Sequence, residues 1–295
     1  MPTRPNTAPD RPQEGHPTEI QLTADGSHTL YSHRFGQQYH DTNGAIDESR
    51  HVFFENSGMM QRLRADEDIH ILEMGFGTGL NLLLVADALQ QTGSRSRVRY
   101  TSIEGYPIDT HTASQLNYHD HLPHIHPPSS IHPPPSSLHP PPSSIIHPPS
   151  TLIPHPSAFF SNLRLGTNTF PISEQLELSL FIGLFQDFVF PARGIDVIFF
   201  DAFSPKANPE LWTSSVFRAL YDHAHPGCVM STYCAAVSAR AAMCHAGWHV
   251  ARGPGFKTRR EMTVASKDPA RLEGLARVDE GRYARRYAEG EFGAP

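Results

Sequence analysis

Cysteine is scarce in this sequence of 295 residues, with Cys228, Cys234 and Cys244 as its only examples. Three cysteines at this spacing fit neither a disulfide framework nor a CxxC zinc site, so we predict no metal centre and a reducing, cytoplasmic location. The sequence also has no run of about 18 apolar residues, which argues against a membrane-spanning helix. The N-terminal 17 residues lack an apolar stretch and do not resemble a secretory signal.

Positive charge is in the minority along the chain. The 24 Lys and Arg residues stand against 30 Asp and Glu residues, which gives a formal net charge of −6. This balance argues against a protein that binds nucleic acid with its whole surface, although it leaves room for a local basic patch.

Histidine and proline are abundant but unevenly distributed. Seven of the 19 His and thirteen of the 27 Pro fall within residues 121–156, where units such as HPPSSI and HPPPSSL repeat. Because proline fixes φ and lacks an N–H, neither helix nor sheet can propagate there. We therefore predict a disordered insertion rather than a metal-binding repeat, since ordering a floppy chain around an ion is costly. We also expect a disordered N-terminus over residues 1–18, one domain over residues 19–267 and a charged tail over residues 268–295.

Hydrophobic patterning predicts an α/β domain. Short alternating segments flank the turn dipeptide Asp25-Gly26, which predicts a β-hairpin near the N-terminus. A buried strand at 69–74, a glycine-rich turn, an apolar helix at 80–89 and a strand at 98–104 form a βαβ unit, which is typical of parallel sheets. We expect a Rossmann-like, mostly parallel sheet with an antiparallel last strand. The further strands are predicted at residues 176–182, 195–200, 228–233, 248–251 and 261–265.

The strongest chemical signal is the glycine-rich turn, which runs from Glu73 to Gly79 as EMGFGTG. Glycines let the backbone bend tightly and approach a ligand, and the helix N-terminus behind the turn favours polar or anionic ligand atoms. A dinucleotide fingerprint needs a third glycine at position 80, where this chain has Leu80. A hydride-transferring dehydrogenase is therefore disfavoured, and a turn that binds no ligand stays open as an alternative.

Two acidic residues follow predicted parallel strands. Glu104 ends the second strand, where a carboxylate can accept hydrogen bonds from both ribose hydroxyls of a nucleoside. Asp201 ends a strand rich in Ile and Phe, at the sheet edge where ligands bind in open parallel sheets. The competing interpretations are a solvated loop residue for Glu104 and a helix cap for Asp201.

Three segments resemble one family, the tRNA 5-methylaminomethyl-2-thiouridine methyltransferases, which act on the wobble uridine. They are residues 73–81 (EMGFGTGLN), 199–212 (FFDAFSPKANPELW) and 255–262 (GFKTRREM). The resemblance implies a methyltransferase fold, S-adenosyl-L-methionine as cofactor and the anticodon arm of tRNA as partner. The family occurs alone or fused to a flavin-dependent oxidase, and this chain resembles the stand-alone form. A separate enzyme would then supply the aminomethyl-uridine intermediate.

The resemblance also implies roles for individual residues. Asp201 is expected to be catalytic, because it could orient the substrate amine and accept its proton. Phe203 could pack against the substrate base, with ordinary core packing as the alternative. Lys257, Arg259 and Arg260 are expected to bind tRNA phosphates, with a solvated charged face as the alternative. The predicted cofactor-binding residues are Glu73, Gly75, Phe76, Gly77, Gly79, Asn81, Glu104 and Asp187.

Two departures from the family pattern concern the site. Family members usually carry Gly-Asp after the strand that here ends near Gly183, and that Asp holds the adenine amino group; this chain has Leu184 instead. Asp187 is the predicted replacement. The last motif carries Lys257 and two arginines where relatives have a glycine and a Lys-Arg pair. Two alternatives therefore stay open: a methyltransferase for small amines, and a non-catalytic protein that kept the fold. Failure to bind S-adenosyl-L-methionine would exclude both enzymes and favour the non-catalytic protein.

Overall fold

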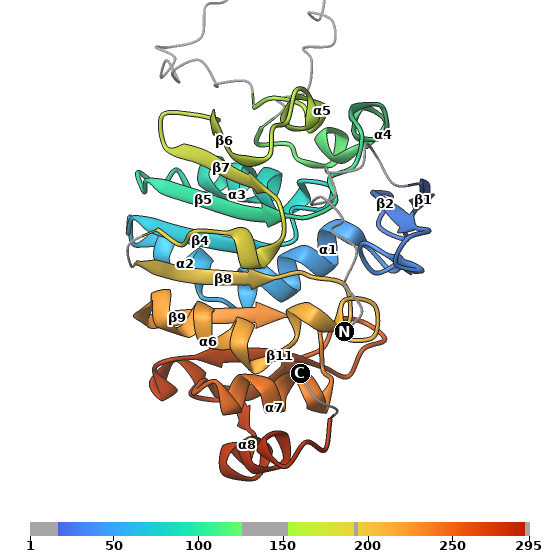
Figure 1. Ribbon diagram of the computed structural model, residues 1–295. Helices are drawn as coiled ribbons and strands as arrows, with labels where there is room; N and C mark the ends of the chain where they lie inside the picture. The colour runs from blue at the N-terminus through green and yellow to red at the C-terminus, as the bar shows by residue number, and fades with distance from the viewer. Residues whose placement is uncertain (1–16, 126–152, 192–193, 293–295) are drawn as a thin grey trace, which may run out of the picture.

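The computed structural model describes residues 17–125, 153–191 and 194–292, and in these residues a nine-stranded sheet forms the centre of the molecule (Figure 1). The strand order is β12-β10-β11-β9-β8-β4-β5-β7-β6. Five central strands are parallel, and the strands at both edges run antiparallel to their neighbours. The parallel strands are β4 (Ile69–Met74), β5 (Val98–Glu104), β7 (Leu176–Ile182), β8 (Ile195–Phe200) and β9 (Ala224–Thr232). The others are β6 (Gly166–Pro171), β10 (His249–Pro254), β11 (Glu261–Ser266) and β12 (Ala276–Arg277).

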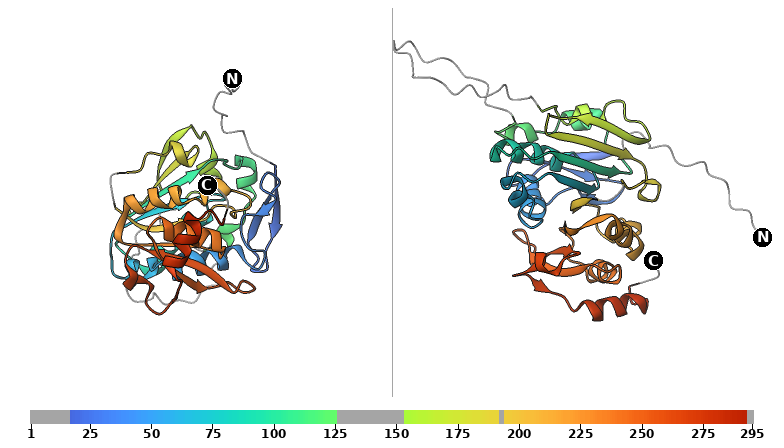
Figure 2. Two further views of the ribbon diagram at one scale, coloured as in Figure 1. Left: turned by 60° about the horizontal axis from the view of Figure 1, so that its bottom comes forward. Right: turned by 90° about the vertical axis from the view of Figure 1, so that its left-hand side faces the viewer.

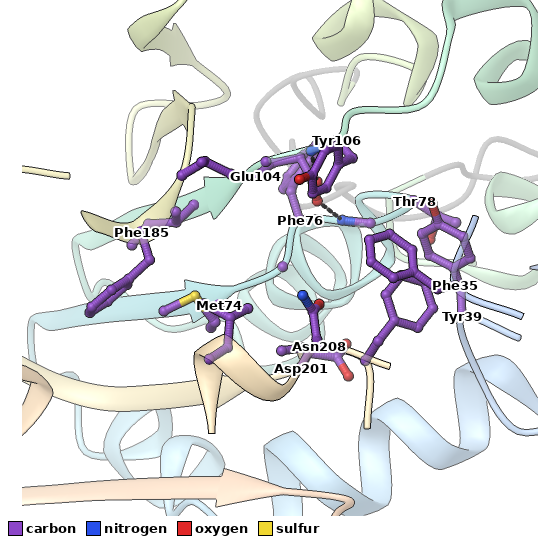
Figure 3. Close-up of a pocket in the computed structure, with 18 of the residues that line it drawn as sticks. Phe35, Tyr39, Met74, Phe76, Thr78, Glu104, Tyr106, Phe185, Asp201 and Asn208 are labelled. Atoms are coloured by element: carbon purple, nitrogen blue, oxygen red, sulfur yellow. Dashed lines mark hydrogen bonds between the residues drawn. The ribbon is translucent and has the colours of Figure 1, made fainter. Parts of the chain in front are cut away.

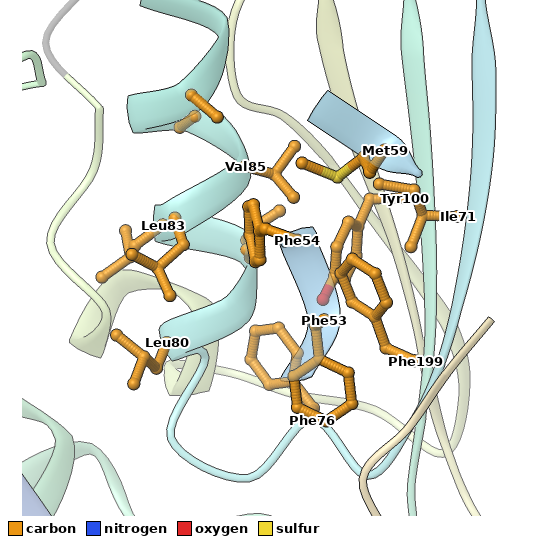
Figure 4. Packing of buried hydrophobic residues seen from close by; sticks show 14 of the residues in the cluster. Phe53, Phe54, Met59, Ile71, Phe76, Leu80, Leu83, Val85, Tyr100 and Phe199 are labelled. Atoms are coloured by element: carbon orange, nitrogen blue, oxygen red, sulfur yellow. The ribbon is translucent and has the colours of Figure 1, made fainter. Parts of the chain in front are cut away.

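Helices cover both faces of the sheet, which explains why the middle strands β4 and β8 are almost entirely buried. All six residues of β4 are buried, as expected for a parallel strand covered on both faces. Along β8, Val197 and Phe199 join one hydrophobic cluster, while Ile198 and Phe200 join the other. Figure 4 shows Phe199 and Tyr100 packing against Phe53 and the residues of α3.

The helices divide between the two clusters. On the first face lie α1 (Ala45–Ser49), the π-helix η1 (Arg50–Glu55), α2 (Met59–Arg64) and α3 (Leu80–Thr92). On the second lie α6 (Ser214–His223), α7 (Val237–His245) and α8 (Glu280–Ala288). Shorter helices connect the strands: α4 (Thr110–Ser114), η2 (Tyr118–His121), α5 (Ser157–Phe160), η3 (Phe185–Asp187), η4 (Pro209–Leu211) and η5 (Pro269–Leu272).

A separate three-stranded antiparallel sheet lies at the carboxyl ends of the parallel strands (Figure 1). It comprises β1 (Thr18–Leu22), β2 (His28–Ser32) and β3 (Gln37–Gln38). The predicted hairpin around Asp25-Gly26 is confirmed, because β1 and β2 pair with Leu22 opposite His28. Neither the short β3 nor the π-helix that follows α1 was predicted from the sequence.

The fold class predicted from the sequence is confirmed, with two corrections at the edges of the domain. Residues 121–125 and 153–156 of the predicted insertion are described, and Leu122, Ile125 and Ile153 are buried in the core. The predicted boundaries at 121 and 156 therefore reach too far into the folded domain. The central part of the insertion and most of the predicted disordered N-terminus lie outside the described residues.

The second correction concerns residues 268–292, which were predicted to be a charged helix or tail beyond the domain boundary at residue 267. β12 extends the main sheet, and α8 packs beside α7 at the end opposite β6 (Figure 2). Leu272, Val278 and Tyr283 are buried. These apolar positions are spaced between charged residues, so composition alone suggests a tail while the buried side chains attach the segment to the domain. No helix in the described parts of the chain is long and apolar enough to cross a membrane.

Candidate active site

The candidate site lies where the order of the parallel strands reverses. β4 has β5 on one side and β8 on the other, so the loops after β4 and β8 diverge and leave a crevice, the usual ligand site of open parallel sheets. A cavity of about 170 Å³, here called the inner cavity, occupies this crevice (Figure 3). In Figure 3, Glu104 and Asp201 lie on opposite sides of it, with Phe185 toward one end and Tyr39 toward the other.

The glycine-rich turn after β4 forms the floor of the inner cavity. Gly75, Gly77 and Gly79 all have positive φ, at 92°, 55° and 78°. A Cβ atom at Gly75 would lie 3.0 Å from the carbonyl oxygen of Asp201, and one at Gly77 would lie 3.2 Å from the ring of Tyr39. Only glycine fits both the conformation and the space here. Gly75, Phe76 and Gly77 line the cavity, whereas Gly79 starts α3 behind it.

Glu104 faces the inner cavity from the end of β5. Its carboxylate accepts hydrogen bonds from the backbone N–H groups of Gly77, at 3.0 Å, and Tyr106, at 2.6 Å. Burial raises the pKa of Glu104, while these backbone donors oppose the rise. The carboxylate is thereby fixed beside the glycine-rich turn, in a position from which its remaining lone pairs can accept from ligand hydroxyls.

At the inner cavity, one amide joins the buried carboxylate of Glu73 to the partly buried carboxylate of Asp201. Nδ2 of Asn81 donates to Oε1 of Glu73 at 2.9 Å and to Oδ2 of Asp201 at 3.1 Å. Ser102 also donates to Glu73, at 2.7 Å. Burial raises the pKa of Glu73 to about 8, and burial together with the negative charge of Glu73 raises the pKa of Asp201 well above its usual range. Glu73 therefore favours the neutral form near pH 7, and the pKa of Asp201 is shifted in the same direction.

Two acceptors point to a ligand with positively charged or N–H groups. Oδ1 of Asn81 is buried and accepts no hydrogen bond in the described structure, although Asn81 lines the inner cavity. Asp201 also lines the cavity, whereas Glu73 lies behind Asn81 and does not. An unsatisfied buried acceptor costs free energy, which a ligand donor would recover. The cavity therefore suits the sulfonium and amino groups of S-adenosyl-L-methionine.

Aromatic side chains from the small N-terminal sheet close the cavity. Phe35 stacks on Phe203 with ring centroids 4.4 Å apart, and Tyr39 meets Phe203 edge-on at 5.1 Å. Gln37 donates to the hydroxyl of Ser204 at 2.6 Å, which fastens the sheet to the loop after β8. Phe203 thus lines the cavity as part of this wall.

One end of the inner cavity, near Phe185, differs from the prediction made for Asp187. Asp187 is exposed and does not line the inner cavity, because η3 turns its side chain away. Leu184, Phe185 and Gln186 line this end instead. A glutamine amide can accept from the adenine amino group and donate to a ring nitrogen, so Gln186 offers the chemistry expected of Asp187.

Only part of the predicted basic segment faces a cavity. Arg259 and Arg260 line a second cavity of about 740 Å³, here called the outer cavity, whereas Lys257 pairs with Asp47 at 3.3 Å and does not line it. Arg259 lies 3.3 Å from Asp41 and 3.4 Å from Glu48. Arg260 is exposed and makes no ion pair within the described residues. Lys257 and Arg259 are therefore engaged with acidic side chains, whereas Arg260 is available to bind a phosphate.

No role was predicted from the sequence for the cavity residues Tyr39 and His40. Tyr39, His40 and Tyr233 line both cavities, so the two adjoin. Burial lowers the pKa of His40 to about 4, which keeps it neutral near pH 7. Glu48 enters the outer cavity from α1. The acidic segment 47–48 was the only available signal, since nothing local reveals that this helix folds back onto the sheet edge.

The raised pKa of Glu73 makes stability depend on pH. The folded pKa of about 8 exceeds the ordinary value of 4.5, so the unfolded chain releases this proton first and folding loses stability as pH rises from about 5 to 8. Glu73→Gln keeps an acceptor for Asn81 and removes the charge. We expect its free energy of unfolding to fall less steeply over this range, by up to about 1.4 kcal/mol per pH unit. Denaturant titrations at pH 5, 6, 7 and 8 measure this; parallel slopes for the two proteins would contradict it.

Known proteins resemble this chain in sequence and in fold. A family described as S-adenosyl-L-methionine-dependent methyltransferase matches residues 152–268. The tRNA 5-methylaminomethyl-2-thiouridine biosynthesis bifunctional protein MnmC of Cupriavidus metallidurans is 30% identical over 254 residues, which are 86% of this chain and 34% of that protein. MnmC of Leptospira interrogans is 28% identical over 258 residues, 85% of this chain and 36% of its own length.

A solved structure agrees at the level of fold. The crystal structure of MNMC2 from Aquifex aeolicus superposes with a TM-score of 0.64 and 24% identity, covering 96% of this chain and 79% of the other. The chain spans about a third of the length of the curated MnmC relatives. It belongs to the S-adenosyl-L-methionine-dependent methyltransferases, as a methyltransferase domain homologous to MnmC over most of its length.

Proposed function

We propose that this chain methylates the primary amine of 5-aminomethyl-2-thiouridine at the wobble position of tRNA. The observation that carries the proposal is the partly buried Asp201 carboxylate, which lines the inner cavity. The names of the MnmC relatives supply the substrate class. A tRNA substrate and the scarcity of cysteine are both consistent with a cytoplasmic location.

The cofactor would occupy the inner cavity. When bound there, S-adenosyl-L-methionine supplies a methyl group on a sulfonium, which transfers to nitrogen as the carbon–sulfur bond breaks and leaves S-adenosylhomocysteine. Glu104 would accept from the ribose hydroxyls, the N–H groups of the glycine-rich turn would meet the ligand, and Asn81 would accept from its amino group. Glu73 would not contact the ligand, and would instead hold the Asn81 amide in position through its hydrogen bond.

Asp201 would prepare the substrate amine for attack. An ammonium has no lone pair, so one proton must leave before the nitrogen can attack the methyl carbon. With its pKa raised by burial, Asp201 in its ionised form is a stronger base than an exposed carboxylate and can accept that proton. Transfer within a closed cavity also excludes water and aligns the reacting atoms.

The RNA would lie over the outer cavity. Arg260 is the basic residue of the predicted segment that is most available for a phosphate, and Arg259 is the next candidate once its acidic partners are engaged elsewhere. Phe203 would contribute to the wall against which the uracil ring rests. A separate enzyme would supply the aminomethyl-uridine that this reaction consumes.

Methyl transfer to hypomodified tRNA tests the function. The protein is incubated with methyl-labelled S-adenosyl-L-methionine and tRNA that lacks the final methyl group, and the nucleosides are then analysed. We expect label in 5-methylaminomethyl-2-thiouridine. Asp201→Asn should lower kcat by about 100-fold or more, because general-base catalysis is lost, with little change in cofactor affinity. Full turnover by this variant would exclude the role of Asp201, and transfer to free amines alone would favour a small-molecule enzyme.

Calorimetric binding of S-adenosyl-L-methionine tests the adenine end. Gln186→Ala should raise Kd by about tenfold, the effect of removing a paired hydrogen-bond group. Asp187→Ala, the matched control next along the chain, should leave Kd unchanged because Asp187 does not line the cavity. The reverse order of the two effects would restore the original prediction for Asp187, and no binding by any variant or the parent would favour a non-catalytic protein.

A further inference from the structure

Glu48 is a carboxylate of the outer cavity, separate from Glu104 and Asp201, which line the inner cavity. Glu48 projects from α1, and its side chain is only 8% exposed although it lines the outer cavity. One oxygen, Oε2, accepts from the backbone N–H of Asp41 at 2.5 Å. The other, Oε1, accepts no hydrogen bond in the described structure. A buried carboxylate with an empty acceptor position is costly unless a ligand fills it.

Arg259 is the cation nearest to that empty acceptor, and it is held loosely. Its Nη1 lies 3.4 Å from Oε1 of Glu48, and its Nε lies 3.3 Å from Asp41, but neither contact has hydrogen-bond geometry among the described residues. Arg240 offers a contrast: its guanidinium is 2% exposed and donates three hydrogen bonds to Thr263, Glu261 and Met262. Arg259 is 39% exposed, so its side chain is partly open to solvent.

Glu48 also lies within electrostatic reach of the proposed base. The negative charge of Glu48 is among the causes, after burial and the charge of Glu73, that raise the pKa of Asp201. Tyr233 stands between the cavities, with its hydroxyl bonded to the carbonyl of Ala202 and its ring under the guanidinium of Arg259. A cation seated against Glu48 is therefore close to the cavity that contains Asp201.

We propose that Glu48 binds the protonated amine of the substrate nucleoside, by exchanging Arg259 for that ammonium. The inference rests on the proposed function and adds a residue to it. The exchange conserves charge at Glu48, since one monovalent cation replaces another, and it fills the empty acceptor with an N–H donor. Arg259, once released, can turn toward a phosphate of the RNA. Glu48 is thus a positioning residue that admits an amine-bearing nucleoside and delivers it toward Asp201.

The test compares binding of two tRNAs to the full chain. One carries 5-aminomethyl-2-thiouridine at the wobble position and the other carries plain 2-thiouridine, so they differ only in the amine. The parent protein should prefer the first by about tenfold or more, as expected for a charge-assisted hydrogen bond. Glu48→Gln should reduce the preference to about one. Glu55→Gln, a nearby exposed carboxylate that lines neither cavity, should keep it.

Several outcomes would overturn the assignment. A parent protein without preference, or a Glu48→Gln variant that retains it, would exclude the ammonium contact. Equal weakening of both tRNAs by Glu48→Gln would mean that Glu48 acts only by holding Arg259. If Glu48→Gln no longer binds S-adenosyl-L-methionine and is misfolded, the same binding comparison is made with Arg259→Gln. That variant should bind both tRNAs more weakly while keeping or increasing the preference for the amine, and loss of the preference would overturn the exchange.

Methyl transfer by the parent protein separates this inference from the proposed function. If the parent methylates the aminomethyl tRNA but Glu48→Gln keeps the parent's preference and KM, only the role of Glu48 fails. If the parent transfers no methyl group to that tRNA, the proposed function fails and the role of Glu48 with it.

Discussion

The site depends on one side-chain amide that joins a buried carboxylate to a partly buried one. Asn81 donates to Glu73 at the end of β4 and to Asp201 just after β8, and so connects the two strands where the order of the sheet reverses. Burial raises the pKa of both acids, and neither forms an ion pair within the described residues. The fold thereby maintains a cavity that favours an incoming positive charge. Both a sulfonium and a protonated amine carry one.

The small N-terminal sheet completes this arrangement from outside the main sheet. Phe35 stacks on Phe203, and Gln37 bonds to Ser204, so the loop after β8 is held in place by a segment far away in the sequence. The chain then continues into α1, which brings Glu48 to the outer cavity. The N-terminal region thus contributes to both cavities, while the loops after the parallel strands supply the rest of the inner cavity.

Local patterns sufficed for the parallel sheet and for the glycine-rich turn, because strand periodicity and glycine spacing are local properties. They also indicated Asp201 and Glu104, since both follow strands whose carboxyl ends meet in a parallel sheet. Glu48 and Gln186 could not be found in this way. Their placement depends on how α1 folds back and how η3 turns, and both result from tertiary packing. The tail boundary was misplaced for the same reason, as Tyr283 is buried by contacts across the fold.

Proton release on cofactor binding tests the central claim most directly. If Glu73 and Asp201 are largely neutral in the free protein, binding of the cationic S-adenosyl-L-methionine should drive a proton off the pair at pH 7. Titration calorimetry in two buffers of different ionisation enthalpy measures the protons released. We expect a release approaching one proton, and a smaller release for Glu73→Gln. Identical binding heats in the two buffers would show that no proton leaves, and would contradict the account.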